Sequence, residues 1–149
     1  MVGRTFGGAT VAVMQGCLVL LVSLITGFRF PLLGIPGALL FMILIAIIFT
    51  AIGSSIASTM SDFQGFQTLM NVLVMPMFFL SGALFPLADS PPVMRAIAAI
   101  DPLSYGVDGL RAVLIHQQYY SVGLDIAVLL GVSLLTLWIG SLLFNRIEV

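Results

Sequence analysis

Long apolar stretches alternate with short polar ones along the whole chain. Four of these stretches, residues 6–28, 36–60, 64–87 and 124–144, contain no charged residue except Asp125. A helix of about 20 apolar residues is long enough to cross a hydrocarbon core of about 30 Å. The runs are continuous rather than alternating, which disfavours the strands of a membrane barrel. The pattern therefore predicts an all-α polytopic transmembrane bundle with four spans in a single domain, residues 1–149.

Two shorter amphipathic segments, residues 91–100 and 103–115, precede the last span. Neither is long enough to cross a bilayer, so we expect a short re-entrant or interfacial helix pair at one edge of the membrane. Asp108 and Arg111 lie three positions apart in the second segment. This spacing on a helix predicts an ion pair between them.

The third stretch has a stripe of polar residues on one helical face, namely Gln64, Gln67, Thr68 and Asn71. Side-chain amides in lipid need partners, so this stripe should face protein or a wet cavity. Two interpretations remain open: hydrogen bonds between helices that only stabilise the fold, and the lining of a path. Pro76 removes one backbone donor, which predicts a kink in the middle of this helix and a possible hinge.

Small residues recur every four positions in the first stretch, at Gly8, Ala12 and Gly16. This spacing lets a neighbouring helix approach closely. We favour packing within the chain over a contact between two copies.

The composition excludes several classes of protein. The chain is 60% hydrophobic and 7% charged, whereas soluble domains average about 25% charged residues. The net charge of -1 offers no basic surface, so we expect no nucleic-acid partner. One cysteine excludes an internal disulfide, and the Cys and His residues lack zinc spacing. No glycine-rich phosphate loop with a lysine is present, so we expect no cofactor, no metal and no ATP hydrolysis on this chain.

Catalysis is not expected from the polar residues near the last span. Asp101 and Asp108 raise the possibility of an intramembrane aspartyl protease, but they lie in one short stretch rather than on facing spans. His116, with Ser104 or Ser121, lacks a nucleophile elbow and a third, orienting group. The chain is therefore predicted not to be an enzyme.

Two motifs in the second half of the chain indicate a family. FFLSGALFPL, residues 78–87, is followed by DPLSYGVDGLR, residues 101–111. In this order, before a last span, they resemble the ABC-2 family permeases, the membrane subunits of bacterial ABC exporters. The likeness is strongest to the drug-resistance and nodulation-type permeases. The resemblance implies six spans, cytoplasmic termini and a place in the bacterial inner membrane, and this chain looks like the last four spans, an incomplete permease domain.

The resemblance also implies a function and its partners. The chain would form the translocation pathway of an exporter together with a second permease copy in the lipid bilayer. A separate ATP-binding subunit would bind and hydrolyse the ATP. The alternative is a small scaffold or assembly subunit without transport activity, or a truncated permease fragment. The substrate class, whether drug, lipid or polysaccharide, stays open.

Two groups of residues follow from these arguments. The candidates for the pathway and its gate are Gln67, Asn71, Pro76, Ser81, Gly82 and Pro86. The residues that the resemblance assigns to building the second re-entrant helix are Pro102, Tyr105, Asp108 and Arg111. We interpret both groups as architectural and gating residues rather than as substrate ligands.

Overall fold

The computed structural model describes residues 2–145 and contains only helices and turns in that range. The helices are α1 (Val2–Ile25), α2 (Gly34–Thr59), α3 (Phe63–Leu80), α4 (Pro92–Ala98), α5 (Pro102–Ile115) and α6 (Val122–Asn145), with a 3₁₀ turn at Leu87–Asp89. Four of them, α1, α2, α3 and α6, are long and apolar enough to cross a membrane. The predicted all-α bundle of four spans, with a short helix pair before the last one, is confirmed.

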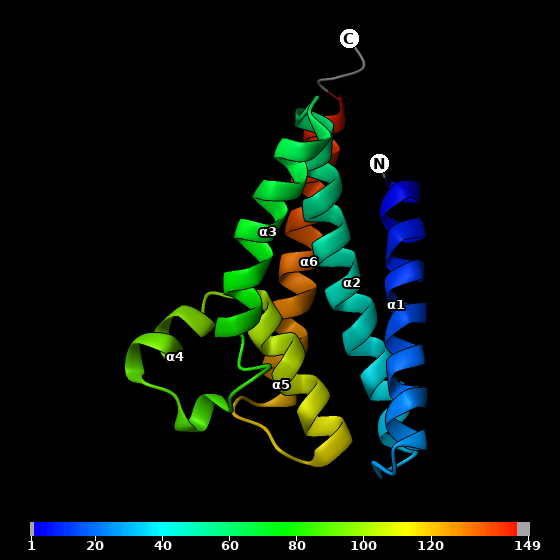
Figure 1. Cartoon of the computed structure of the whole chain (residues 1–149), viewed down its shortest axis with the longest axis vertical. Coiled ribbons are helices and arrows are strands. Elements are labelled where there is room, and N and C mark those ends of the chain that lie inside the picture. The colour runs from blue at the N-terminus through cyan, green and yellow to red at the C-terminus, as the bar shows by residue number, and fades with distance from the viewer. Residues whose placement is uncertain (1, 146–149) are drawn as a thin grey trace.

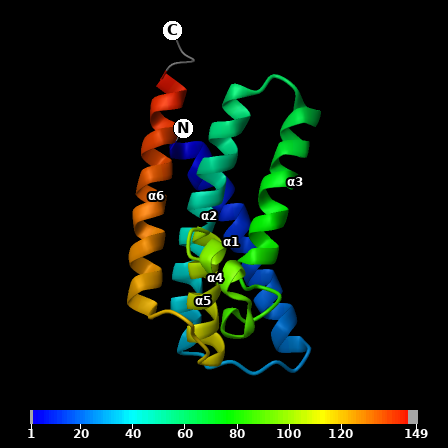
Figure 2. The same ribbon diagram turned by 90° about the vertical axis from the view of Figure 1, so that its left-hand side faces the viewer.

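Helix α2 lies at the centre of the bundle and packs against α1, α5 and α6 (Figures 1 and 2). The buried core joins three helices, because Phe41, Leu44 and Ile48 of α2 meet Tyr105 of α5 and Leu129 of α6. In contrast, α3 has no buried residue, and it diverges from α2 after the short turn that joins them (Figure 1). The core therefore includes the short helix α5 together with two of the four spans.

Glycines set the close approach of α1 and α5 to α2. A side chain at Gly109 would collide with the ring of Phe41, and one at Gly106 would come within 2.5 Å of the Ile45 side chain. On α1, a Cβ atom at Gly8 would lie 2.6 Å from the Thr50 side chain of α2. The small residues of α1 thus pack within the chain, which is the interpretation that the sequence favoured.

The two ends of the bundle differ. The first residues of α1, the last residues of α6 and the α2–α3 turn lie together at one end (Figure 1). The opposite end, which we call the loop end, holds the loop at residues 26–33, the segment at 81–91 and the turn at 116–121. Helix α5 begins part-way along the bundle and runs outward to the loop end without crossing it. This is the arrangement of a re-entrant helix.

The third helix is shorter than the predicted span of residues 64–87, because it ends at Leu80. Ser81 caps it by donating its backbone N–H to Met77 O at 2.8 Å, and its hydroxyl donates to Phe78 O at 2.9 Å. Gly82 then adopts a φ of 81°, in the left-handed region that glycine tolerates best, and turns the chain away. The helix itself continues through Pro76, so the kink at this residue stays a prediction.

Candidate functional site

Helix α5 begins at a sequence that suits a helix start. The Asp101 carboxylate accepts the Leu103 N–H at 2.9 Å, and Pro102 occupies the first turn, where no backbone donor is needed. The second carboxylate oxygen of Asp101 is buried without a hydrogen-bond partner. Burial raises the pKa of this carboxyl to about 6, and the Leu103 N–H partly opposes that rise.

Tyr105 connects α5 to the helix before it and to the turn after it. Its hydroxyl donates to Ala99 O, at the end of α4, over 2.8 Å. Its ring stacks on Tyr120 with 4.9 Å between the ring centroids. One side chain of α5 therefore holds both flanking segments.

Asp108 holds the turn that leads into α6. Its two carboxylate oxygens accept the backbone N–H groups of Tyr119 and Tyr120, each at 2.7 Å, and its side chain is 6% exposed. The predicted ion pair with Arg111 is wrong, since no such pair joins them among residues 2–145. Arg111 instead donates to Ala83 O at 3.2 Å. The backbone amides of the turn outcompete the guanidinium for the carboxylate, so both side chains bind segments distant in sequence.

The segment between α3 and α4 brings the predicted residues Ser81, Gly82 and Pro86 to this same end of the molecule. Ser81 is 1% exposed, and a Cβ atom at Gly82 would lie 2.8 Å from Leu87. Pro86 accepts the Ser90 hydroxyl at 3.1 Å through its carbonyl oxygen. The bond from Arg111 to Ala83 fixes this segment to α5.

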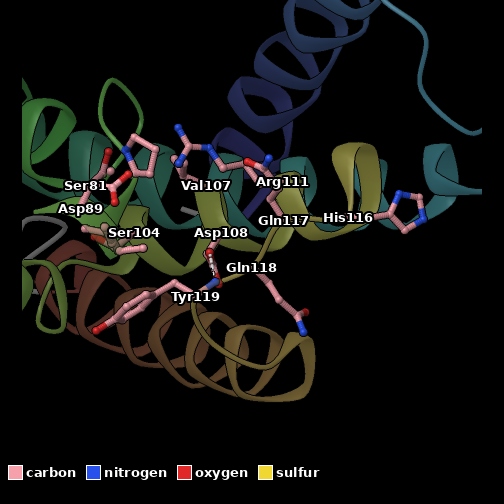
Figure 3. A pocket seen from close by; sticks show the side chains of 14 residues that line it. Ser81, Asp89, Ser104, Val107, Asp108, Arg111, His116, Gln117, Gln118 and Tyr119 are labelled. Carbon is pink, nitrogen blue, oxygen red and sulfur yellow. Dashed lines mark hydrogen bonds between the residues drawn. The ribbon is translucent and has the colours of Figure 1, made fainter.

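A cavity of about 520 Å³ lies between these parts (Figure 3). Its wall comes from the segment after α3, from α5 and from the turn after α5. The lining side chains used below are Ser81, Asp89, Ser104, Asp108, Arg111 and Tyr119. Figure 3 shows the backbone N–H of Tyr119 directed at Asp108, on the floor between α5 and α6. The cavity therefore has both polar and apolar walls, and it is built by three segments that α5 holds together.

The other predicted residues, Gln67, Asn71 and Pro76, lie elsewhere. They are exposed on α3, whose partly covered positions include Phe66 and Met70. The structure thus divides the predicted residues into a group around α5, in which Pro86 is exposed and the others are buried or partly buried, and an exposed group on α3.

Sequence reasoning missed two buried polar groups. Ser104 is completely buried, lines the cavity, and has a hydroxyl without a hydrogen-bond partner. Asp125 of α6 is also completely buried, and neither of its carboxylate oxygens has a partner within residues 2–145. The spacing of Asp101, Ser104 and Asp108 on one helical face was the available signal for Ser104. The lone charge in the fourth apolar stretch was the signal for Asp125.

The acidic side chains of α5 bind backbone groups rather than one another. No group of three or more His, Cys, Asp or Glu side chains in the described part of the chain could hold a metal ion. Asp101 and Asp108 are bonded to backbone amides of separate segments rather than to each other. The polar side chains of α5 instead position its neighbours.

Comparisons with known proteins place the chain among membrane transporters. Residues 1–115 match the family described as ABC-2 type transporter. The chain is 29% identical over 129 residues to Nodulation protein J of Rhizobium leguminosarum bv. viciae, a match that covers 87% of this chain and 49% of that protein. It is 24% identical over 98 residues to Nodulation protein J of Rhizobium meliloti, covering 66% of this chain and 37% of that protein.

A third relative carries a more general name. The chain is 32% identical over 72 residues to Putative transport permease ycf38 of Porphyra purpurea, which covers 48% of this chain and 25% of that protein. The chain spans about half the length, or less, of these curated relatives. No solved structure is significantly similar to it.

Proposed function

Because the chain belongs to the ABC-2 type transporter family, we propose that it is a permease subunit that forms the substrate pathway of an ABC-type exporter. A second permease copy completes the pathway, and a separate ATP-binding subunit drives it. The protein lies in the bacterial inner membrane with its termini in the cytoplasm, so that the loop end faces outward. ATP binds to the partner subunit and not to this chain.

The observation that supports this proposal best is the exposed polar stripe on α3. Gln67 and Asn71 are exposed, and α3 has no buried residue at all. An amide left in hydrocarbon without a hydrogen bond costs roughly 2–7 kcal/mol. A second subunit or a water-filled path must therefore cover this face of α3 in the membrane.

The contacts of α5 support a gate at the loop end. Tyr105, Asp108 and Arg111 each hold a different neighbouring segment by a hydrogen bond. These segments consequently move together with α5. Gly106 and Gly109 allow α5 to lie close against α2, so a shift between the two helices would displace the segments at 81–91 and 116–121.

A cross-linking experiment tests the position of α3. In a Cys17→Ser background, we expect Asn71→Cys to form a disulfide between two copies in native membranes. Met70→Cys is the matched control, because Met70 faces Gly53 of α2, with its methyl group 3.8 Å from a Cβ atom built there. Equal cross-linking at both positions, or none at Asn71→Cys, would contradict a pathway between two α3 helices.

A transport experiment tests the function itself. The chain is reconstituted in vesicles with its ATP-binding subunit, and the ATP-dependent efflux of a fluorescent drug or lipid is measured. A scaffold or assembly subunit without transport activity is the second candidate. A stable complex that hydrolyses ATP without any efflux would favour the scaffold.

A further inference from the structure

We propose that the cavity at the loop end binds a phosphoethanolamine group, the zwitterionic headgroup of phosphatidylethanolamine. This site lies at the proposed gate, because Ser81, Gly82 and Pro86 line it, and not on the polar stripe of α3. Its occupation requires neither ATP nor a second subunit, so the inference goes beyond the proposed function.

One guanidinium, Arg111, and two carboxylates, Asp89 and Asp108, line the cavity without forming an ion pair with one another. The Arg111 guanidinium donates to Ala83 O, and no carboxylate among residues 2–145 forms an ion pair with it. A guanidinium has five N–H donors in a planar fork, a geometry that fits phosphate oxygens. Arg111 therefore has donors left for the phosphate of a ligand.

Asp89 supplies the complementary charge for the ammonium group. Its side chain is exposed at the cavity, and no hydrogen bond to its carboxylate occurs in the described structure. Asp108 is less suited, because both of its oxygens already accept backbone N–H groups and it is 6% exposed. A ligand that spans from Arg111 to Asp89 thus carries one anionic and one cationic group.

The hydroxyl of Ser104 is an independent sign of a ligand. It is completely buried, lines the cavity and has no hydrogen-bond partner. A buried polar group without a partner costs about 1–3 kcal/mol. A phosphate oxygen held by Arg111 would accept a hydrogen bond from this hydroxyl.

The location of the cavity favours a lipid as the source of the headgroup. It lies at an end of the membrane bundle, and its lining includes Tyr119, which is 42% exposed. Tyrosine and tryptophan side chains concentrate at the level of the lipid headgroups. The volume of about 520 Å³ is within the usual range of about 300–1,000 Å³ for small-molecule sites.

Native mass spectrometry of the purified, delipidated full chain tests the proposal. Phosphatidylethanolamine, phosphatidylglycerol and phosphatidylcholine are added separately, and their dissociation constants are compared. We expect the tightest binding for phosphatidylethanolamine, because phosphatidylglycerol lacks the ammonium group and phosphatidylcholine lacks its N–H donors. Equal binding of the three lipids would overturn the proposal.

Variants test whether Asp89 binds the ammonium group of the lipid and whether Arg111 binds its phosphate. Asp89→Asn should reduce the preference for phosphatidylethanolamine over phosphatidylglycerol about tenfold, since one hydrogen bond between charged groups is lost. Arg111→Gln should weaken the binding of all three lipids by a similar factor. Arg29→Gln is the control, because Arg29 is exposed at the same end and does not line the cavity. An Asp89→Asn protein that behaves like this control contradicts the proposal even if Arg111→Gln fails to fold.

Competition with soluble glycerophosphoethanolamine identifies the source of the group. Displacement of phosphatidylethanolamine supports a site that recognises the headgroup alone. Retention of the lipid, with the variant effects above, supports a site that needs the acyl chains as well. Displacement of the lipid by inorganic phosphate at equal concentration would show that the cavity binds any anion. This result would overturn the proposal that it recognises a zwitterionic headgroup.

Discussion

Helices α3 and α5 both contain polar residues within a hydrophobic protein, but they use them in opposite ways. On α5, Asp108 and Tyr105 are buried and bond to backbone groups of other segments. On α3, Gln67 and Asn71 are exposed and face away from the rest of the chain. The comparison teaches that the polar groups of α5 stabilise this chain itself. Those of α3 are available to a second subunit or to water.

Removal of Asp108 should have the largest effect on the stability of the isolated chain. Asp108→Ala leaves the backbone N–H groups of Tyr119 and Tyr120 without acceptors, which should lower the free energy of unfolding by about 3 kcal/mol. Asp108→Asn retains one acceptor and should lose about half as much. Thermal unfolding in detergent measures both, and an unchanged melting temperature for the alanine variant would remove the contrast between the helices.

A methyl group at Gly109 should have the next largest effect. Gly109→Ala places a Cβ atom against the ring of Phe41, and such overpacking costs about 1–3 kcal/mol. Adding Phe41→Leu makes room and should restore part of the loss. Gly131→Ala is the control, because no atom lies within 4 Å of a Cβ built there, and it should be neutral or stabilising. Thermal unfolding distinguishes the variants, and a loss at Gly131→Ala equal to that at Gly109→Ala would contradict close packing as the cause.

Asp101 should make the stability depend on pH. Burial raises the pKa of its carboxyl from 3.8 to about 6, so the folded chain binds this proton more tightly than the unfolded chain does. The contribution of Asp101 to stability therefore falls as the pH rises from about 4 to about 6. Asp101→Asn keeps an acceptor for the Leu103 N–H and removes this dependence. Melting temperatures between pH 4 and 8 measure it, and identical pH profiles for both proteins would refute the assignment.

The smallest effect is expected on α3. Asn71→Leu should change the free energy of unfolding of the isolated chain by less than about 0.5 kcal/mol, because the side chain contacts little of this chain. The same change should weaken the association of two copies, which analytical ultracentrifugation in detergent would detect. A large loss of stability in the monomer would show that α3 belongs to the core after all.

The apolar stretches predicted the spans because lipid as a solvent excludes charge over a fixed length. The short amphipathic segments were also correct in type, since α4 and α5 are too short to cross a bilayer. The error at the end of α3 has a local cause, because residues 81–87 stay apolar while Gly82 turns the backbone. Hydropathy indicates whether a segment lies in lipid or in water, but it does not indicate where a helix ends.

The site was harder to predict because its contacts are distant in sequence. The spacing of Asp108 and Arg111 allows a pair, but it contains no information on competing partners. Those partners, the amides of Tyr119 and Tyr120 and the carbonyl of Ala83, come from other segments. The burial of Asp125 likewise follows from the packing of α6 against the core and not from its own stretch.

The start of α5 part-way along the bundle has a consequence for biosynthesis. With 14 residues, α5 is too short for the translocation machinery to insert as an independent span, which needs about 20. Its core residue Tyr105 belongs to the same buried cluster as Phe41 of α2, which is synthesised before α5, and Leu129 of α6, which is synthesised after it. We therefore expect α5 to remain at the aqueous surface during translation and to enter the membrane only after the ribosome has completed α6.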